Sequence, residues 1–319
     1  MTIPQLIEQH DGKRFSIEVL PPLKGRGINQ LFNNIDSLIE FNPLYINITT
    51  HRSELVFKST PDGLFQRVSE RSRPGTVAVA VAIQQRYGIP AVPHLICSGY
   101  SKIETEYALI DLNFLGITNL LLLRGDKAKH DSRFIPNENG HSHASELQKQ
   151  VNDFNNGLFI DGTKMDIVAE MPKFSYGVAG YPEKHEEAPN PDIDMLWLKN
   201  KVDNGASYIV TQMFFDNKKY FDFVDRCRKA DINVPIIPGI KPIVSKNQLN
   251  ILPRVFHVDI PTELATEIAN CKDDNQAKQI GIEWGIKQLR ELYASNIPSV
   301  HMYSLNATNS VRKILEATL

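Results

Sequence analysis

The chain has 319 residues, of which 42% are hydrophobic and 23% are charged, and its formal net charge at pH 7 is −2. This composition is typical of an ordinary globular protein. A charge so close to zero gives no electrostatic reason to bind nucleic acid or an acidic membrane surface. No apolar run is long enough to span a bilayer. We therefore expect neither nucleic acid nor a membrane among its partners.

The cysteines and the first residues favour a cytoplasmic protein. Cys97, Cys227 and Cys271 are odd in number and form no CxxC pair, which is typical of a reducing compartment. The opening stretch MTIPQLIEQHDGKRF lacks the basic start and apolar centre of a signal peptide.

Short apolar runs of β-forming residues alternate with longer amphipathic segments. Eight runs are expected to form strands, at 14–21, 44–50, 91–98, 119–125, 174–181, 208–215, 234–240 and 300–306. Because helical patterns lie between most of them, we predict an α/β protein, a (β/α)₈ TIM barrel that forms a single domain over residues 1–319. The runner-up is an open doubly wound sheet, which is weakened because no GxGxxG follows the first strand.

Helix boundaries can be predicted at two of the crossovers. One helix is expected to begin after Ser101, its cap, and to close on Gly116. Another is expected in PDIDMLWLKNKVDNGA, where Asp192 can cap the helix and Gly205 can terminate it.

The segment from Asp126 to Phe174 begins with a long polar loop, residues 127–142, before a helix near 144–155. Loops of that length are usually functional or mobile. One interpretation is that this loop covers the site.

Polar side chains recur where the predicted strands end, which is where barrels of this type carry their chemistry. They are Glu18, Thr49, Thr50, His51, His94, Arg124, Asp126, Tyr181, His185, Gln212 and Asn306. Because they come from several independent strands, together they predict a functional site at one end of the barrel.

Each of these residues also has a structural explanation. Glu18 interrupts the apolar strand RFSIEVLPP, and it could be the buried partner of an arginine. A single His94 is more often a core histidine than a catalyst. Thr49 and Thr50 are ordinary strand residues, and RGD directly after an apolar strand is a weak adhesion signal.

Asp194 and Lys201 lie seven residues apart on one face of a predicted helix. One interpretation is a solvated ion-pair edge. The other is a ligand-facing edge, with Lys201 near a phosphate and Asp194 near a hydroxyl group.

Two other classes of function remain open for a barrel with polar residues at its strand ends. His130, His141 and His143 share the long loop, as expected if the barrel is a metal-dependent hydrolase. However, no carboxylate–histidine cluster at the strand ends completes a zinc set, so we expect no metal. The other class is a non-catalytic binding protein that presents RGD on a loop tip.

Six longer stretches of the sequence form a recognisable series. They follow one another in order and together extend over nearly the whole chain. They are FSIEVLPP, VPHLICSG, GITNLLLLRGD, GVAGYPEKHEEAP, KVDNGASYIVTQMFFDNKKYFDFVDRCR and VPIIPGIKPI. In these stretches the chain resembles methylenetetrahydrofolate reductase of the bacterial type, a catalytic barrel without a regulatory domain.

The resemblance implies an oxidoreductase that holds FAD non-covalently across the barrel mouth, without a Rossmann unit. NADH or NADPH would reduce the flavin, which would then convert 5,10-methylenetetrahydrofolate to 5-methyltetrahydrofolate with ping-pong kinetics, supplying methyl groups for methionine synthesis. It also implies a homo-oligomer. The choice of NADH or NADPH and the preference for folate polyglutamates are left open.

The resemblance also implies roles for individual residues. Glu18 matches the general acid, and Asp126 matches the carboxylate near the flavin and the pterin. Gln212 and Gln248 match substrate-contacting positions, and Thr49 matches a position near the flavin and the nicotinamide. The positions that match FAD contacts are Thr50, Arg52, His94, Arg124, Gly125, Ala144, Tyr181, His185, Ala188, Asp194 and Lys201.

The sequence departs from the family pattern at two positions in its last third. Ala307 stands where many members carry arginine, which puts one contact to the folate tail in question. Leu252 occupies a position that is aromatic in some members.

The implied reaction gives a physical reason for a carboxyl group inside a strand. Opening the imidazolidine ring of the substrate releases an amine that needs a proton, and a general acid must hold one near the working pH. Desolvation at the barrel mouth, beside a second carboxylate at Asp126, would keep Glu18 protonated.

Overall fold

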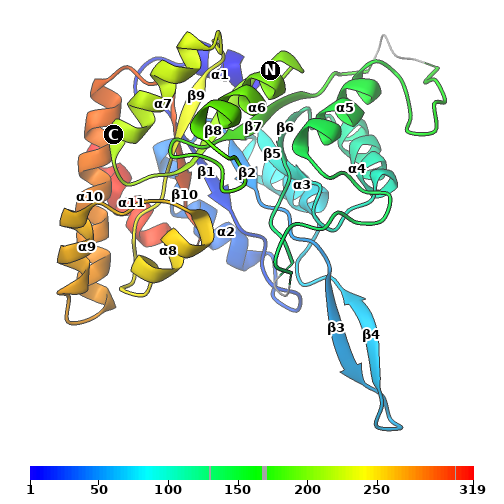
Figure 1. Cartoon of the computed structure of the whole chain (residues 1–319), viewed down its shortest axis with the longest axis horizontal. Coiled ribbons are helices and arrows are strands. Elements are labelled where there is room, and N and C mark those ends of the chain that lie inside the picture. The colour runs from blue at the N-terminus through cyan, green and yellow to red at the C-terminus, as the bar shows by residue number, and fades with distance from the viewer. Residues whose placement is uncertain (129–130, 167–170, 306) are drawn as a thin grey trace. The chain divides into compact units, whose positions relative to one another are not determined.

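The computed structural model describes residues 1–128, 131–166, 171–305 and 307–319. Eight strands close into a barrel in the order β1-β10-β9-β8-β7-β6-β5-β2 (Figure 1). Their bounds are β1 Phe15–Val19, β2 Ile46–Ile48, β5 Ala91–Ile96, β6 Asn119–Leu123, β7 Ser175–Gly180, β8 Tyr208–Met213, β9 Ile236–Ile240 and β10 Val300–Tyr303. The predicted (β/α)₈ barrel and its eight strands are confirmed, and the open sheet is wrong.

Helices connect the strands at most crossovers, as the alternating pattern predicts. They are α1 Ile3–Gln9, α2 Asn29–Asp36, α3 Thr76–Tyr87, α4 Lys102–Phe114, α5 Ala144–Asn155, α6 Pro191–Asp203, α7 Asn217–Lys229, α8 Gln248–Phe256, α9 Thr262–Ala269, α10 Asp274–Ala294 and α11 Thr308–Thr318, with a short 3₁₀ helix at Ile39–Phe41. Among the described residues, no helix is both long enough and apolar enough to cross a membrane.

The helix caps show where local chemistry decides a boundary. Ser101 caps α4 in a capping box with Glu104, as predicted. The cap predicted for α6 is wrong, because Asn190 takes that position and its side chain accepts the N–H of Ile193 at 2.9 Å. Pro191 at the first helical position starts the helix two residues earlier than a cap at Asp192 would, and it leaves Asp192 in the first turn.

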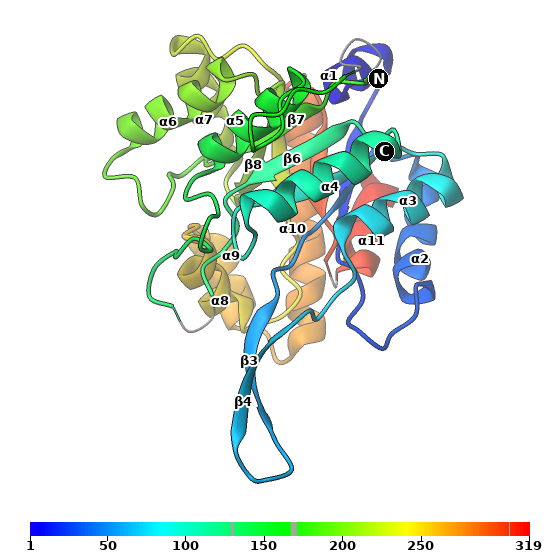
Figure 2. The same cartoon turned by 90° about the vertical axis from the view of Figure 1, so that its right-hand side faces the viewer.

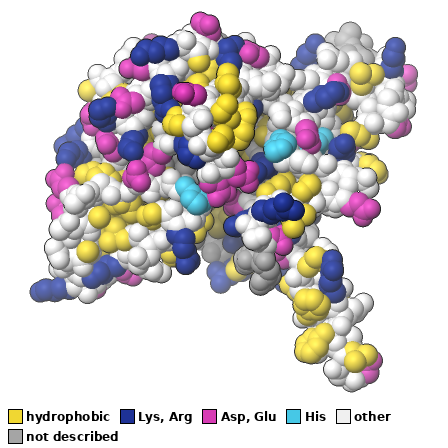
Figure 3. All heavy atoms as spheres, viewed as in Figure 1, with side chains coloured by type: hydrophobic (Ala, Val, Ile, Leu, Met, Phe, Trp, Pro, Cys, Tyr) yellow, Lys and Arg dark blue, Asp and Glu magenta, His cyan; other side chains and the backbone are white. Residues whose placement is uncertain are grey.

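An antiparallel hairpin, β3 Glu54–Ser59 and β4 Phe65–Glu70, is a feature that the sequence analysis missed. In both views it extends away from α3, α4 and α5 (Figure 2). Phe57 and Phe65 are each 70% exposed, and hydrophobic side chains line the hairpin in the space-filling view (Figure 3). The signal was present, since Pro-Asp-Gly between two β-forming runs is a turn sequence.

The chain divides into two compact units. One unit comprises Met1–Val19, Asn33–Asn47 and Ser175–Leu319, and the other comprises Leu20–Phe32 and Ile48–Phe174. The first unit carries β1 and β7 to β10, and the second carries β5, β6 and the hairpin. The residues of the predicted site are described below for each unit in turn.

Candidate active site

Glu18 lies on β1, a strand that is buried along its whole length, and the residue is only 6% exposed. β1 pairs in parallel with β10, so that Ser16 lies opposite His301 and Glu18 lies opposite Tyr303. Because side chains alternate along a strand, Ser16 and Glu18 point to the same face of β1. These pairs therefore form two successive polar rows across the two strands.

The carboxyl group of Glu18 has basic neighbours. Its Oε2 lies 3.6 Å from Nε2 of His301, which has no exposure to solvent. Lys241, half-buried, follows β9 directly. Burial lowers the pKa of the Lys241 ammonium group, and the charge of Glu18 partly opposes that shift. Glu18 thus has a histidine and a lysine as its basic neighbours, whereas the sequence suggested an arginine as its structural partner.

Tyr303 packs beside Glu18 because the neighbouring strand leaves room for its ring. A Cβ added at Gly239 would lie 2.6 Å from that ring and 2.3 Å from the carbonyl oxygen of Thr211. Tyr303 donates its hydroxyl proton to that carbonyl oxygen at 2.8 Å, and the N–H of Gly239 donates to the Thr211 hydroxyl at 2.9 Å. The ring position is therefore fixed by β8 and β9.

The two glutamines predicted to contact the substrate are oriented by the backbone. Oε1 of Gln212 accepts the N–H of Met213 at 2.9 Å, and Oε1 of Gln248 accepts the N–H of Val244 at 2.6 Å. Because each amide oxygen is used in this way, each NH₂ group is the end that can donate to a ligand.

The loop after β7 holds Tyr181, His185 and Ala188 together. The rings of Tyr181 and His185 meet edge to face at 4.7 Å. Lys184 stands at a φ of 132°, which is rare for a residue with a side chain, and its ammonium group donates to the carbonyl oxygens of His185 at 2.8 Å and Ala188 at 2.6 Å. These bonds hold the loop in one conformation.

Asp194 and Lys201 connect α6 to that loop and to β7. Oδ2 of Asp194 accepts the N–H of His185 at 3.0 Å, and Nζ of Lys201 donates to the carbonyl oxygen of Ala179 at 2.7 Å. Burial lowers the pKa of Lys201 to about 8, although the Asp194 carboxylate raises it. The two side chains are therefore bonded to the loop and to β7, respectively, and do not form a solvated edge.

In the second unit, the residues after β2 surround the end of β5. The hydroxyl of Thr50 donates to the carbonyl oxygen of His94 at 2.5 Å, and the hydroxyl of Thr49 lies 3.3 Å from Nε2 of His51. His94 is buried at 3% exposure. Nε of Arg52 is buried and makes no hydrogen bond within the described ranges. That nitrogen lies 3.9 Å from Oε1 of Glu54, beyond hydrogen-bond distance, so it can still donate to an added acceptor group.

The end of β6 makes a tight turn through Arg124, Gly125 and Asp126. Gly125 has a φ of 80°, and a Cβ there would lie 2.9 Å from Cβ of Ser98. The hydroxyl of Ser98 donates to the carbonyl oxygen of Asp126 at 2.6 Å. The guanidinium of Arg124 lies 4.8 Å from the centre of the Phe134 ring, and Asp126 itself is exposed.

The long loop ends at Ala144, the first residue of α5, whose N-cap makes no side-chain hydrogen bond to the helix. His141 is buried with its Nε2 2.6 Å from Oε1 of Gln150, and burial lowers its pKa. Among the residues that the structure describes, no group of three or more His, Cys, Asp or Glu side chains could hold a metal. His130 and Asn306, which the sequence analysis singled out, lie outside the described residues.

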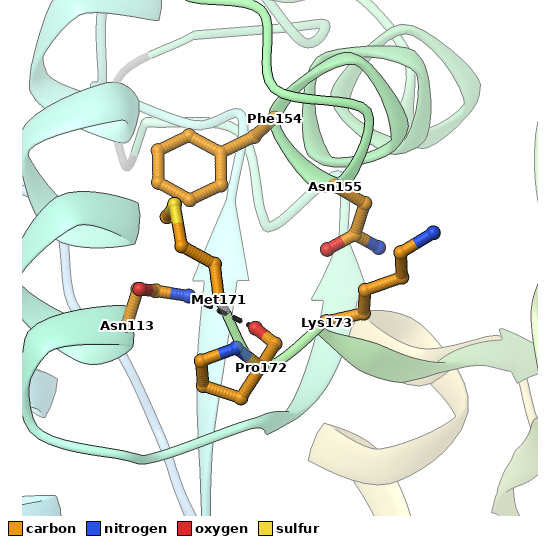
Figure 4. Close-up of a pocket in the computed structure, with 6 residues that line it drawn as sticks. All are labelled: Asn113, Phe154, Asn155, Met171, Pro172 and Lys173. Atoms are coloured by element: carbon orange, nitrogen blue, oxygen red, sulfur yellow. Dashed lines mark hydrogen bonds between the residues drawn. The ribbon is translucent and has the colours of Figure 1, made fainter. Parts of the chain in front are cut away.

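A small hollow in the second unit is too small for a cofactor. Its volume is about 10 Å³, which is room for a single water. Figure 4 shows its lining, with Asn113 bonded to the carbonyl oxygen of Pro172 and with Met171 beside Phe154. It contains none of the predicted site residues, so the candidate site is defined by the strand ends.

The sequence analysis overlooked the groups that lie beside Glu18 or act on its charge. They are His301, Lys241 and Tyr303. A signal for two of them was present, because His301 and Tyr303 alternate along a predicted strand as Ser16 and Glu18 do. Their pairing with β1, however, depends on the closure of the barrel.

Comparison with known proteins gives consistent relatives. The chain is 32% identical over 306 residues to methylenetetrahydrofolate reductase 1 of Schizosaccharomyces pombe, covering 95% of this chain and 45% of the relative. It is 30% identical over 294 residues to 5,10-methylenetetrahydrofolate reductase of Escherichia coli, covering 91% of this chain and 86% of that one. The chain spans about half the length of the eukaryotic relatives it matches.

A solved structure shares the fold. It is an uncharacterized protein from Clostridium thermocellum that binds two copies of 5-methyl-5,6,7,8-tetrahydrofolic acid, with a TM-score of 0.55 and 14% identity, covering 98% of this chain and 96% of that one. The family profile for methylenetetrahydrofolate reductase matches residues 2–318. The chain therefore belongs to the methylenetetrahydrofolate reductase family.

Proposed function

We propose that the chain is an enzyme that reduces 5,10-methylenetetrahydrofolate to 5-methyltetrahydrofolate with NADH or NADPH, through bound FAD and with ping-pong kinetics. The observation that carries this proposal is the buried carboxyl group of Glu18 near the C-terminal end of β1. It stands in a chain that matches the family over residues 2–318. The folate relatives supply the substrate class.

Glu18 suits the role of general acid for the ring-opening step. The leaving amine of the substrate needs a proton, and a carboxyl group away from water keeps its proton more readily than an exposed one. Lys241 opposes this effect, because a nearby ammonium group favours the carboxylate. The protonation of Glu18 is therefore a balance between burial and its basic neighbours.

Asp126 and the two glutamines suit the recognition of the pterin. Asp126 is exposed after β6, so its carboxylate can favour a cationic iminium or accept a hydrogen bond from the pterin amine. Gln212 and Gln248 each present an NH₂ donor, because their oxygens accept backbone N–H groups.

The described residues fit FAD by their chemistry. The diphosphate of FAD is an anion, and Arg52 has a buried Nε without a hydrogen-bond partner among the described residues. The N-terminus of α5 at Ala144 lacks a side-chain cap, and such helix ends attract anions. FAD supplies the hydride chemistry when it is bound. The residues proposed to hold it are Thr49, Thr50, Arg52, His94, Arg124, Gly125, Asp126, Ala144, Tyr181, His185, Ala188, Asp194 and Lys201.

An absorbance spectrum tests the cofactor, the donor and the substrate in one experiment. The purified protein should be yellow, should bleach with anaerobic NADH or NADPH, and should recover its colour when methylenetetrahydrofolate is added. Sedimentation of the same sample checks the expected homo-oligomer. A colourless protein that gains hydrolytic activity with zinc would favour the metal-dependent hydrolase, and a colourless protein without turnover would favour a binding protein.

A further inference from the structure

We propose that His301 is a positioning residue for Glu18. In this proposal the neutral imidazole presents its Nε2–H to Oε2 of the carboxyl group, so that Oε1 carries the proton that is transferred. The inference rests on the proposed function, because the position of that proton matters only if Glu18 is the general acid.

The register of two neighbouring strands brings the groups together. Ser16 on β1 lies opposite His301 on β10, one row below Glu18. Nε2 of His301 lies 3.6 Å from Oε2 of Glu18, and this nitrogen makes no hydrogen bond within the described ranges. An unpaired buried N–H costs free energy, so a partner at this distance is favoured to close on it.

The other side of the imidazole determines which nitrogen carries the hydrogen. Nδ1 of His301 lies 2.8 Å from the hydroxyl of Ser16 and 3.4 Å from Nδ2 of Asn47. The amide nitrogen of Asn47 can only donate, and the hydroxyl of Ser16 is able to donate, so Nδ1 acts as the acceptor. The hydrogen of the neutral ring is then on Nε2, the nitrogen that lies next to Glu18.

A charged imidazole does not suit this position. Its Nδ1–H would face the N–H of Asn47, and its charge would lie in a site without exposure to solvent. The neutral Nε2–H tautomer satisfies both constraints. His301 therefore acts on Glu18 as a hydrogen-bond donor, and the proton used in the reaction belongs to the carboxyl group.

The distance of 3.6 Å exceeds a normal hydrogen bond by roughly half an ångström. Contacts in active sites are often long before substrate binds and tighten in the complex. When Oε2 accepts from His301, the carboxyl proton resides on Oε1 and the plane of the group is fixed. Positioning of this kind matters because a misplacement of about 1 Å can cost about 100-fold in rate.

Two other groups act on Glu18, and their ionisation decides which of them enters the pH profile. Lys241 interacts with it electrostatically, and burial lowers the pKa of that ammonium group. Burial and the charge of Glu18 both raise the pKa of Tyr303, whose hydroxyl donates to Thr211. Because Tyr303 stays neutral, Lys241 is the one of these two groups that can ionise. The pH profile of a His301 variant is therefore compared with the pH profile of Lys241→Met.

The tautomer can be tested without any assay of activity. In protein labelled with ¹⁵N-histidine, the His301 resonances are identified by their loss in His301→Gln. We expect a neutral ring with hydrogen on Nε2 at the neutral pH of the assay. Hydrogen on Nδ1 alone, or on both nitrogens near neutral pH, would overturn the proposal.

The positioning role is tested with a pair of variants in the flavin-loaded protein. His301→Phe keeps a ring and removes the donor, so kcat for folate reduction should fall about 10–100-fold, with an altered pH profile and an unchanged rate of NADH oxidation by an artificial acceptor. His301→Gln keeps an N–H donor and should recover most of the loss. Ser16→Ala should show a smaller loss, and Ser310→Ala, at a buried serine on α11, is its matched control.

The outcomes separate this proposal from the function on which it rests. An active wild-type protein with unimpaired folate reduction in His301→Phe would overturn the role of His301 alone. Equal loss in both half-reactions, or a loss of bound flavin, would assign His301 to structure and also overturn it. A flavin-loaded wild-type protein that reduces no folate would instead overturn the proposed function, and the positioning role with it.

Discussion

The imidazole of His301 and the carboxyl group of Glu18 face one another inside the barrel, with Nε2 and Oε2 separated by 3.6 Å. The two residues lie on neighbouring strands, β10 and β1, and both are buried. A carboxyl group in an apolar strand thus has a specific polar environment, built by the strand beside it. That environment is where the proposed acid chemistry can be tested.

Replacing Glu18 with glutamine should separate the two half-reactions. The amide keeps the shape of the carboxyl group but cannot supply its proton, so folate reduction should fall about 10²–10⁴-fold. NADH oxidation by an artificial acceptor and the flavin content should stay the same. Glu8→Gln, at an exposed residue of α1, is the control. Folate reduction near the wild-type rate in Glu18→Gln would show that the acid is another group.

Removing the ammonium group of Lys201 should weaken FAD binding. Burial lowers its pKa to about 8, so the apoprotein loses this positive charge as the pH rises through about 8. The dissociation constant of FAD should therefore increase above that pH in the wild-type protein. Lys201→Met should bind FAD about tenfold more weakly at neutral pH and should lose this pH dependence.

Fluorescence titration of apoprotein with FAD measures both effects. The matched control is Lys199→Met on the same helix, where the ammonium group pairs with Asp203 at the surface. If Lys201→Met and Lys199→Met bound FAD equally well at every pH, Lys201 would have no role in holding the cofactor.

Glu183 should make the stability of the fold depend on pH near neutrality. Burial raises the pKa of this carboxyl group to about 7 from 4.5, although the N–H of Asp259 donates to it at 2.8 Å. Between these two values the folded state binds more protons than the unfolded state, so the free energy of unfolding falls as the pH rises through that window. The destabilisation is complete above pH 7.

Glu183→Gln removes this ionisation and keeps an acceptor for Asp259. Its melting temperature should exceed that of the wild type by about 1–3 °C at pH 8, and the difference should vanish near pH 4.5. Thermal melts across this range measure it, with Glu187→Gln, at an exposed residue of the same loop, as the control. A constant difference at all pH values would contradict the assignment.

Gly239→Ala should disturb the row that contains Tyr303. The added methyl group would lie 2.3 Å from the carbonyl oxygen of Thr211 and 2.6 Å from the Tyr303 ring, so one of them must move. Overpacking of this kind costs about 1–3 kcal/mol of stability. Denaturant unfolding measures the cost, and folate reduction should fall further than the flavin content.

The control for that substitution is Gly27→Ala, because a Cβ at Gly27 meets no atom within 4 Å. It should leave both stability and folate reduction close to the wild type. If the two variants had the same free energy of unfolding, Tyr303 and Thr211 would be able to move aside without loss of stability.

Local periodicity and cap chemistry were enough to predict the fold. All eight barrel strands were expected from their apolar runs, and α5 spans Ala144–Asn155, the stretch predicted for it. Ser101 was expected to cap α4 and does so. These features depend on neighbours within a few residues, which is why they are visible in the sequence.

The misses arise where a competing local signal was stronger. The hairpin β3–β4 was overlooked although Pro61-Asp62-Gly63 marks its turn, because its strands carry exposed apolar residues and lack a clear alternation. The cap of α6 was placed on Asp192, whereas Pro191 starts the helix and leaves Asn190 as its cap.

The sequence by itself determined that the chain forms a (β/α)₈ barrel and that Glu18 interrupts a buried strand. Only the tertiary structure decided what lies around that carboxyl group. His301 lies opposite Ser16, in the row next to that of Glu18. It is 285 residues further along the chain than Ser16. Periodicity shows which face of a strand a side chain occupies, but the register between the first and last strands is set when the barrel closes. The groups that surround Glu18 therefore follow from closure of the barrel.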